Sequence, residues 1–232
     1  MRKLLLAVVC ALLATSARAV PLSVVNVSAP PINCIFDASC TVVVNDTTAP
    51  IELPGSSGEG FLQSRTLKGL PGSPAGGLFG YEYRVDLRQV AGITNIGCVT
   101  SVTLNFGPVV GTIDYNGDGR ASDEVYVVTG GGLGSVGLAS AERTGNSITF
   151  TFASPVCAGS SRGKGESSFF WGLVSTRPPR FINASLTQTS GPALTVEARA
   201  PRFSPRPGSG TKPGPVNKPG PLGNPRPRMK GK

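Results

Sequence analysis

Apolar and polar residues alternate in several short segments of the chain. In FGYEYRVDLRQ, residues 79–89, every second position from Phe79 to Leu87 is apolar, and the positions between them include Glu82, Arg84 and Asp86. Successive side chains of a strand point to opposite faces, so this alternation predicts a half-buried β-strand. The segments 98–106 and 147–153 alternate in the same way and predict two further strands.

Other segments are continuously apolar or rich in β-branched residues. The predicted strands of this kind are 41–44 (TVVV), 125–128 (VYVV), 168–174 (SFFWGLV, buried on both faces), 183–188 and 193–198. Two glycine-rich segments, 49–77 and 129–140, are predicted surface loops, the first with a short strand near 60–66. No segment keeps a helical period. The pattern predicts an all-β protein, an antiparallel β-sandwich or jelly-roll-like domain of roughly 180 residues.

The first nineteen residues have the features of a secretory signal peptide. Arg2 and Lys3 precede an apolar run from Leu4 to Ala14, and small residues stand at Ala17 and Ala19. We therefore predict a signal peptide over 1–19, a domain over 20–198, and a secreted protein, extracellular or periplasmic. No later run is long and apolar enough for a helix that crosses a membrane, so the mature chain is expected to lack such a span.

The last segment, 199–232, differs sharply in composition from the domain. It is rich in proline and glycine, and it carries nine Lys or Arg and no acidic residue. The formal charge of +9 for the whole chain includes three basic residues of the signal peptide, so the domain carries 9 − 3 − 9 = −3. We predict a disordered basic tail that contacts an anionic cell-surface polysaccharide or another polyanion. Specific nucleic-acid binding by the domain is not expected.

Four cysteines remain once Cys10 is removed with the signal peptide. An even number of cysteines in an exported protein predicts disulfides. Four cysteines allow three pairings. The favoured pairing joins Cys34 to Cys40, which are close in sequence, and Cys98 to Cys157, at the ends of two predicted strands.

The segment TIDYNGDGRASDEVYVV, residues 112–128, carries the candidate metal ligands. Asp114, Asn116 and Asp118 are spaced by two, and Gly119 follows. This spacing resembles the DxNxDG start of calcium loops in EF-hands and dockerins, and the resemblance implies side-chain ligation by these three residues and ligation by the carbonyl of Arg120. The loop then departs from the EF-hand pattern, because Val125 stands where the bidentate acid belongs.

The nearby acids Asp123 and Glu124 complete the candidate calcium site, since like charges this close repel unless water or a cation screens them. A plain turn is the alternative. Asn116-Gly117 and Asp118-Gly119 are both favoured turn pairs, because these residue types tolerate positive φ. The sequence leaves both interpretations open.

The chain contains no histidine, which excludes Ser-His-Asp hydrolases, Cys-His proteases and His-ligated zinc. A carbohydrate-active enzyme needs only a pair of carboxylates. Sugar-binding clefts usually also use aromatic side chains as stacking platforms, and Trp171, the only tryptophan, is predicted to lie in the core. The segment GESSFFWGLVSTRPP, residues 165–179, resembles exported bacterial β-sandwich proteins of unassigned function. We expect an exported, non-catalytic binding or adhesion module without catalytic residues. The alternatives are a structural matrix protein or, third, the carbohydrate-active enzyme.

Overall fold

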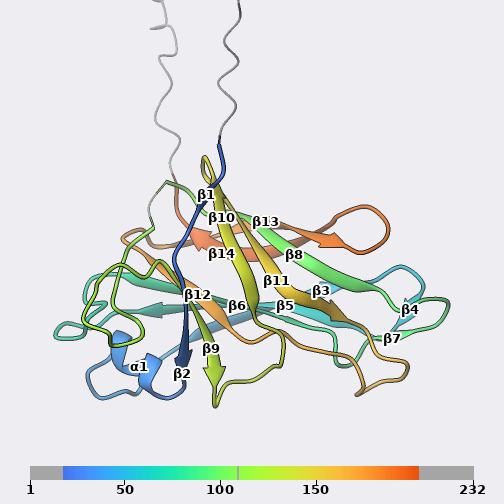
Figure 1. Ribbon diagram of the computed structural model, residues 1–232, viewed down its shortest axis with the longest axis horizontal. Coiled ribbons are helices and arrows are strands. Elements are labelled where there is room, and N and C mark those ends of the chain that lie inside the picture. The colour runs from blue at the N-terminus through green and yellow to red at the C-terminus, as the bar shows by residue number, and fades with distance from the viewer. Residues whose placement is uncertain (1–17, 109, 204–232) are drawn as a thin grey trace, which may run out of the picture.

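Two six-stranded sheets lie face to face in the computed structural model, which describes residues 18–108 and 110–203 (Figure 1). Sheet A has the order β1 (Val20–Pro21), β10 (Leu138–Thr144), β11 (Ser147–Cys157), β8 (Cys98–Asn105), β13 (Pro179–Gln188) and β14 (Leu194–Pro201). All of its neighbouring strands are antiparallel.

Sheet B has the order β2 (Val24–Ser28), β9 (Val125–Gly130), β12 (Trp171–Ser175), β6 (Phe79–Asp86), β5 (Gly60–Lys68) and β3 (Asn45–Ile51). Its strands are antiparallel except for the parallel pair β2 and β9. A short ribbon joins β4 (Ser56–Ser57) to β7 (Ala91–Gly92), and one helical turn, α1 (Pro31–Phe36), lies beside β2 (Figure 1). The predicted all-β class and the packed antiparallel sheets are confirmed.

The main core fills the space between the two sheets. The apolar positions of β6 point into it, as the alternation predicts, and Tyr81, Tyr83 and Val85 are fully buried there. Trp171 is also fully buried, with its ring centroid 5.3 Å from that of Phe152 in an edge-on contact. Aromatic pairs of this geometry add about 0.5–1.5 kcal/mol to the stabilisation from buried area. Trp171 is thus a core residue, as predicted.

Three predictions about local structure are wrong. Residues 41–44 are not in a strand, because β3 begins at Asn45; of the three valines before it, only Val42 packs against the second, smaller apolar cluster. The segment 49–77 is not mainly a surface loop: the short strand expected near 60–66 is present, but as β5, a nine-residue strand in the interior of sheet B. The polar face of β6 does not face solvent, since Glu82, Arg84 and Asp86 are all buried. The turn α1 was not expected from the sequence.

The structure pairs the cysteines as predicted, Cys34 with Cys40 and Cys98 with Cys157. Strand β14 extends to Pro201, so Arg199, the first residue of the predicted tail, lies in sheet A. Residues 1–17 of the predicted signal peptide and 204–232 of the predicted tail lie outside the described residues. Within the described part of the chain, no helix has the length and apolar character needed to cross a membrane.

Candidate functional site

The outer face of sheet B, which points away from sheet A, carries a second buried layer. Phe36 of α1, Tyr115 and Tyr126 pack there as part of a smaller apolar cluster. Gly172 of β12 is the register partner of both Glu82 on β6 and Tyr126 on β9. A Cβ atom on Gly172 would lie 2.6 Å from the Tyr126 hydroxyl oxygen. Glycine at this position therefore lets the tyrosine cross β12 and donate a hydrogen bond to Glu82 Oε1 at 3.0 Å.

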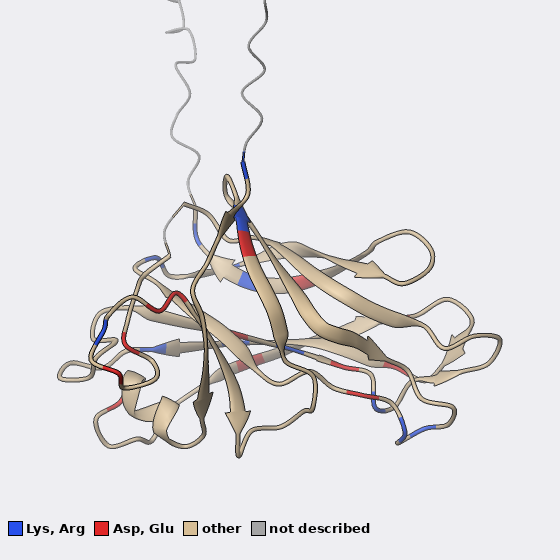
Figure 2. Cartoon of the chain, viewed as in Figure 1, with Lys and Arg blue, Asp and Glu red and all other residues tan. Residues whose placement is uncertain are grey.

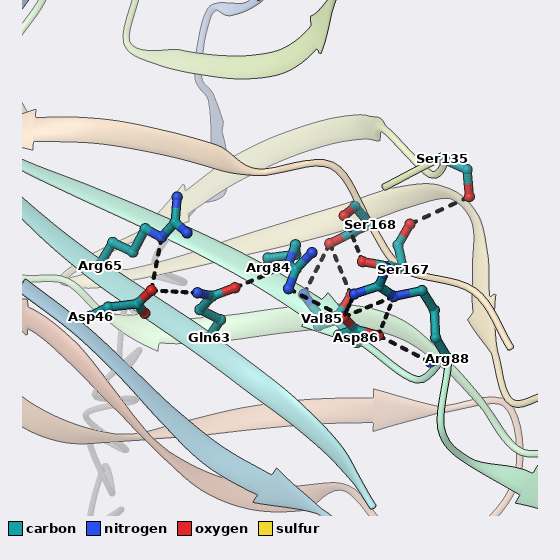
Figure 3. Close-up of polar contacts among 10 residues, drawn as sticks. All are labelled: Asp46, Gln63, Arg65, Arg84, Val85, Asp86, Arg88, Ser135, Ser167 and Ser168. Atoms are coloured by element: carbon teal, nitrogen blue, oxygen red, sulfur yellow. Dashed lines mark hydrogen bonds and ion pairs between the residues drawn. The ribbon is translucent and has the colours of Figure 1, made fainter. Parts of the chain in front are cut away.

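A line of polar side chains crosses β3, β5 and β6 on the same face (Figure 3). Asp46 Oδ2 accepts hydrogen bonds from Gln63 Nε2 at 2.6 Å and from Arg65 Nε at 3.2 Å. Gln63 Oε1 in turn accepts one from Arg84 Nε at 3.0 Å. The register explains the contacts, because Arg84 pairs with Gln63 and Asp46 pairs with Arg65 across neighbouring strands.

The line continues into a buried ion pair. Arg84 Nη2 lies 3.2 Å from Asp86 Oδ2, and both side chains are almost fully buried. Burial alone would raise the pKa of Asp86, but hydrogen bonds from Arg88 and the charge of Arg84 outweigh it, so this pKa is lowered. Burial lowers the pKa of Arg84. The guanidinium groups of Arg65 and Arg84 lie 4.0 and 5.1 Å from the ring centroid of Phe170.

A pocket of about 350 Å³ opens beside this line of side chains, and we call it the outer-face pocket. Apolar side chains make most of its walls: Ile32, Val42, Val44, Leu67, Val128 and Leu133. Arg65, Glu82 and Phe170 also line it. Pockets that hold small ligands commonly combine apolar walls of this kind with a few polar groups that orient the ligand.

Glu82 is the buried ionisable group of the outer-face pocket, with 6% of its surface exposed. Burial raises the pKa of Glu82, and the hydrogen bond from Tyr126 and the charge of Arg65 only partly offset this. Its second carboxyl oxygen, Oε2, makes no hydrogen bond with any described residue and is not fully buried. That oxygen is therefore available to a molecule in the pocket.

A second, open cleft lies at the end of the sandwich near β4 and is lined mainly by polar groups. Its residues include Glu52, Ser56, Glu59, Phe61, Gln89 and Arg162, and its volume is about 1050 Å³. Both glutamates are exposed to solvent. We call this hollow the polar cleft.

The predicted calcium loop forms a turn held by its own side chains. Asp114 Oδ1 accepts hydrogen bonds from the amides of Gly117 and Asp118, and Asp114 Oδ2 accepts one from Gly119. Asn116 Oδ1 bonds the amide of Asp118 as well. Both loop glycines have positive φ, 77° and 85°, as the turn interpretation expects. The three predicted side-chain ligands thus share one turn and bond to its backbone.

The remaining predicted ligands are Arg120, Asp123 and Glu124, and the two acids bond to backbone amides. Asp118 Oδ1 accepts a hydrogen bond from the amide of Arg120. Asp123 is buried and accepts one from the amide of Tyr115, whereas Glu124 Oε2 accepts one from the amide of Ser23. Among residues 18–108 and 110–203, no cluster of three or more His, Cys, Asp or Glu is arranged to hold a metal ion. Calcium binding therefore stays a prediction.

Sequence reasoning missed the outer-face pocket because its parts come from separate strands. One signal was present: Glu82, Arg84, Asp86 and Arg88 alternate in charge along one side of the predicted strand. Figure 2 shows that acidic and basic residues are otherwise spread over many strands and loops of the domain. Alternating charge on one face is thus compatible with ion pairing along the strand, but it does not reveal that the charges are buried.

No protein-family model matches this chain, and neither the curated proteins nor the solved structures include a significant match to it. The function must therefore be inferred from the geometry of the molecule itself.

Proposed function

We propose that this protein is an exported, non-catalytic β-sandwich that binds a small ligand in the outer-face pocket and attaches to anionic polymers through its basic C-terminal segment. The observation that carries the proposal is Glu82. Only 6% of the surface of Glu82 is exposed, and its Oε2, which bonds no described residue, opens on a pocket with largely aliphatic walls; keeping this carboxyl group charged is costly, and a ligand that pairs with Oε2 would offset that cost.

The arrangement of the sheets suits both parts of the proposal. The described chain ends just after β14, which belongs to sheet A (Figure 1). The outer-face pocket is lined by side chains on the face of sheet B that points away from sheet A. Of the nine basic residues after Ala198, Arg199 and Arg202 lie in the described structure, and 9 − 2 = 7 follow it. Attachment through those seven charges would leave the pocket accessible.

Ligand binding is tested by closing the mouth of the pocket. Val44 lines the pocket and is 38% exposed, so Val44→Trp should obstruct it with little effect on the fold. Val43 is 88% exposed and does not line the pocket, so Val43→Trp is the matched control. A ligand found by thermal-shift screening should stabilise the wild type and Val43→Trp, but not Val44→Trp. A screen in which every stabilising compound acts equally on all three proteins would refute the pocket as the binding site.

Attachment is tested by removing the basic segment after Phe203. A cut after Ala198 would damage the fold, because Ala200 is fully buried in β14. The full chain should be retained on a heparin-like matrix and released steeply by salt, whereas the truncated protein should pass through. Equal retention of both proteins would show that the segment is not the adhesive element.

The second candidate is a carbohydrate-active enzyme, favoured by one observation: Glu52 and Glu59 line the same polar cleft. Against it, both side chains are exposed, so neither has the dry surroundings that keep a general acid protonated near neutral pH. Release of reducing sugar from soluble polysaccharides by the wild type, lost in both Glu52→Gln and Glu59→Gln, would establish the enzyme in place of the binding module.

A further inference from the structure

Two opposite charges lie side by side on the floor of the outer-face pocket without pairing. Arg65 on β5 and Glu82 on β6 are direct register partners. Opposite charges at such positions usually attract each other, yet within the described residues no ion pair joins them. Each is held by another group instead: Glu82 by the hydroxyl of Tyr126, and Arg65 by Asp46.

The free ends of both side chains are available to the pocket. The hydrogen bond of Arg65 to Asp46 uses Nε and leaves its two terminal nitrogens unused (Figure 3). Stacking on Phe170 at 4.0 Å fixes the plane of this guanidinium group. The terminal nitrogens bond no described residue, and neither does Glu82 Oε2. The floor of the pocket thus presents the terminal guanidinium nitrogens of Arg65 beside the carboxyl oxygen Oε2 of Glu82.

The walls and the volume limit what can bind. About 350 Å³ is at the small end of the range for ligand pockets, which suits a single small molecule rather than a polymer. The walls come from aliphatic side chains such as Ile32, Val42 and Leu133, so the body of the ligand is apolar. A guanidinium fork matches a carboxylate in shape and charge, and a carboxylate oxygen in an apolar site matches an ammonium group.

We propose that the outer-face pocket binds a free α-amino acid with an aliphatic side chain. The carboxylate of the ligand pairs with Arg65, its ammonium group pairs with Glu82, and its side chain contacts the aliphatic walls. This inference rests on the proposed binding function and adds the chemical class of the ligand. A ligand with one charge alone leaves either Glu82 Oε2 or the terminal nitrogens of Arg65 without a partner.

The test uses isothermal titration calorimetry on the full-length protein with L-leucine as the probe. Three further probes each lack one feature: 3-methylbutylamine lacks the carboxylate, 4-methylpentanoate lacks the ammonium group, and glycine lacks the side chain. Each charged hydrogen bond contributes about 1.5–3 kcal/mol, so loss of either charge should weaken binding about ten- to hundredfold. These comparisons do not depend on any variant folding.

Variants then assign each charge to its partner. Glu82→Gln should lower the affinity for L-leucine about tenfold or more and remove the preference for L-leucine over 4-methylpentanoate. Arg65→Gln should remove the preference over 3-methylbutylamine. Glu59→Gln, in the polar cleft, is the matched control and should bind as the wild type does. Melting curves of all variants establish that they are folded.

Absence of binding by millimolar L-leucine would overturn the inference, and so would equal affinity for L-leucine and either singly charged probe. Unchanged affinity in Glu82→Gln would overturn it as well. If L-leucine fails while another compound stabilises the wild type and Val43→Trp but not Val44→Trp, the amino-acid inference falls and the proposed binding function stands. If no compound distinguishes the two tryptophan variants, the proposed function itself falls.

Discussion

Asp86 pairs with two arginines that differ in burial, and this difference predicts which contact matters for stability. Arg88 Nη2 lies 2.6 Å from Asp86 Oδ2, closer than Arg84 Nη2 at 3.2 Å. Distance alone would rank Arg88 first. However, the side chain of Arg88 is 49% exposed, whereas that of Arg84 is 5% exposed. Water and salt screen the first pair and barely reach the second.

The structure therefore predicts unequal effects of Asp86→Asn and Arg88→Met. An exposed ion pair contributes up to about 1 kcal/mol, so Arg88→Met should lower the free energy of unfolding by less than that. Removing the charge of Asp86 leaves Arg84 buried without a counter-ion, which costs about 3–5 kcal/mol. Arg84 Nη1 already lacks a hydrogen-bond partner among the described residues, so little can compensate. At about 2–4 °C per kcal/mol, Asp86→Asn should lower the melting temperature by roughly 6–20 °C.

Equilibrium unfolding in urea, with the disulfides intact, measures these differences. The double variant Arg84→Met/Asp86→Asn removes both buried charges and should recover about 1 kcal/mol or more relative to Asp86→Asn alone. An Arg88→Met variant as destabilised as Asp86→Asn would refute the reasoning, because contact distance would then outweigh burial. A double variant that is less stable than Asp86→Asn would refute it too.

Three further predictions concern pH, calcium and the disulfides. Burial raises the pKa of Glu82, so its destabilising effect is absent below the usual glutamate pKa of about 4.3 and grows as pH rises through the raised pKa. Glu82→Gln should thus raise the melting temperature at pH 8 and not at pH 4; an equal change at both would contradict this. If Asp114, Asn116 and Asp118 bind calcium, the ion should raise the melting temperature and Asp118→Ala should abolish that rise. Asp114 already uses three of about four acceptor sites for amides, so identical melting curves in calcium and in chelator would establish the plain turn instead. The Cys98–Cys157 bridge spans 59 positions and the Cys34–Cys40 bridge spans 6. By loop-closure entropy, replacing both cysteines of a bridge by serine should lower the free energy of unfolding in urea by about 4 kcal/mol for the first and about 2 kcal/mol for the second, and equal losses would argue against that mechanism.

The strands that could be predicted are those with one apolar face toward the main core. In β6, β8 and β11 the period of two is visible in sequence because alternate residues meet different surroundings. The short strand expected near 60–66 is present as β5, but its full length and its place in the interior of sheet B were missed for a physical reason. Its sequence, GFLQSRTLK, places Gln63, Ser64 and Thr66 at buried positions, and the side chains of Gln63 and Ser64 bond there to polar neighbours. Propensity and hydropathy do not anticipate polar residues satisfied by partners on other strands.

The alternation in β6 predicted the two faces of the strand but not what covers the second one. A period of two identifies which side chains point together, and exposure depends on whatever packs above them. Here Phe170, placed just before β12, lies over Arg84 and Arg65 from a distant part of the sequence. The charges of β6 are therefore buried by long-range contacts that no local pattern contains.

The same argument explains why the turn at Asp114 stood out and the outer-face pocket did not. A metal loop concentrates its ligands within a dozen residues, so composition alone reveals it. The pocket depends on register: Glu82 and Tyr126 are 44 positions apart, and they meet because Gly172 stands between them without a side chain. A methyl group at Gly172 would separate the tyrosine from the carboxyl group and leave Glu82 buried without its hydrogen bond. The chemistry of this face therefore depends on three strands together. Gly172 of β12 is part of the site, because the absence of a side chain there lets Tyr126 reach Glu82.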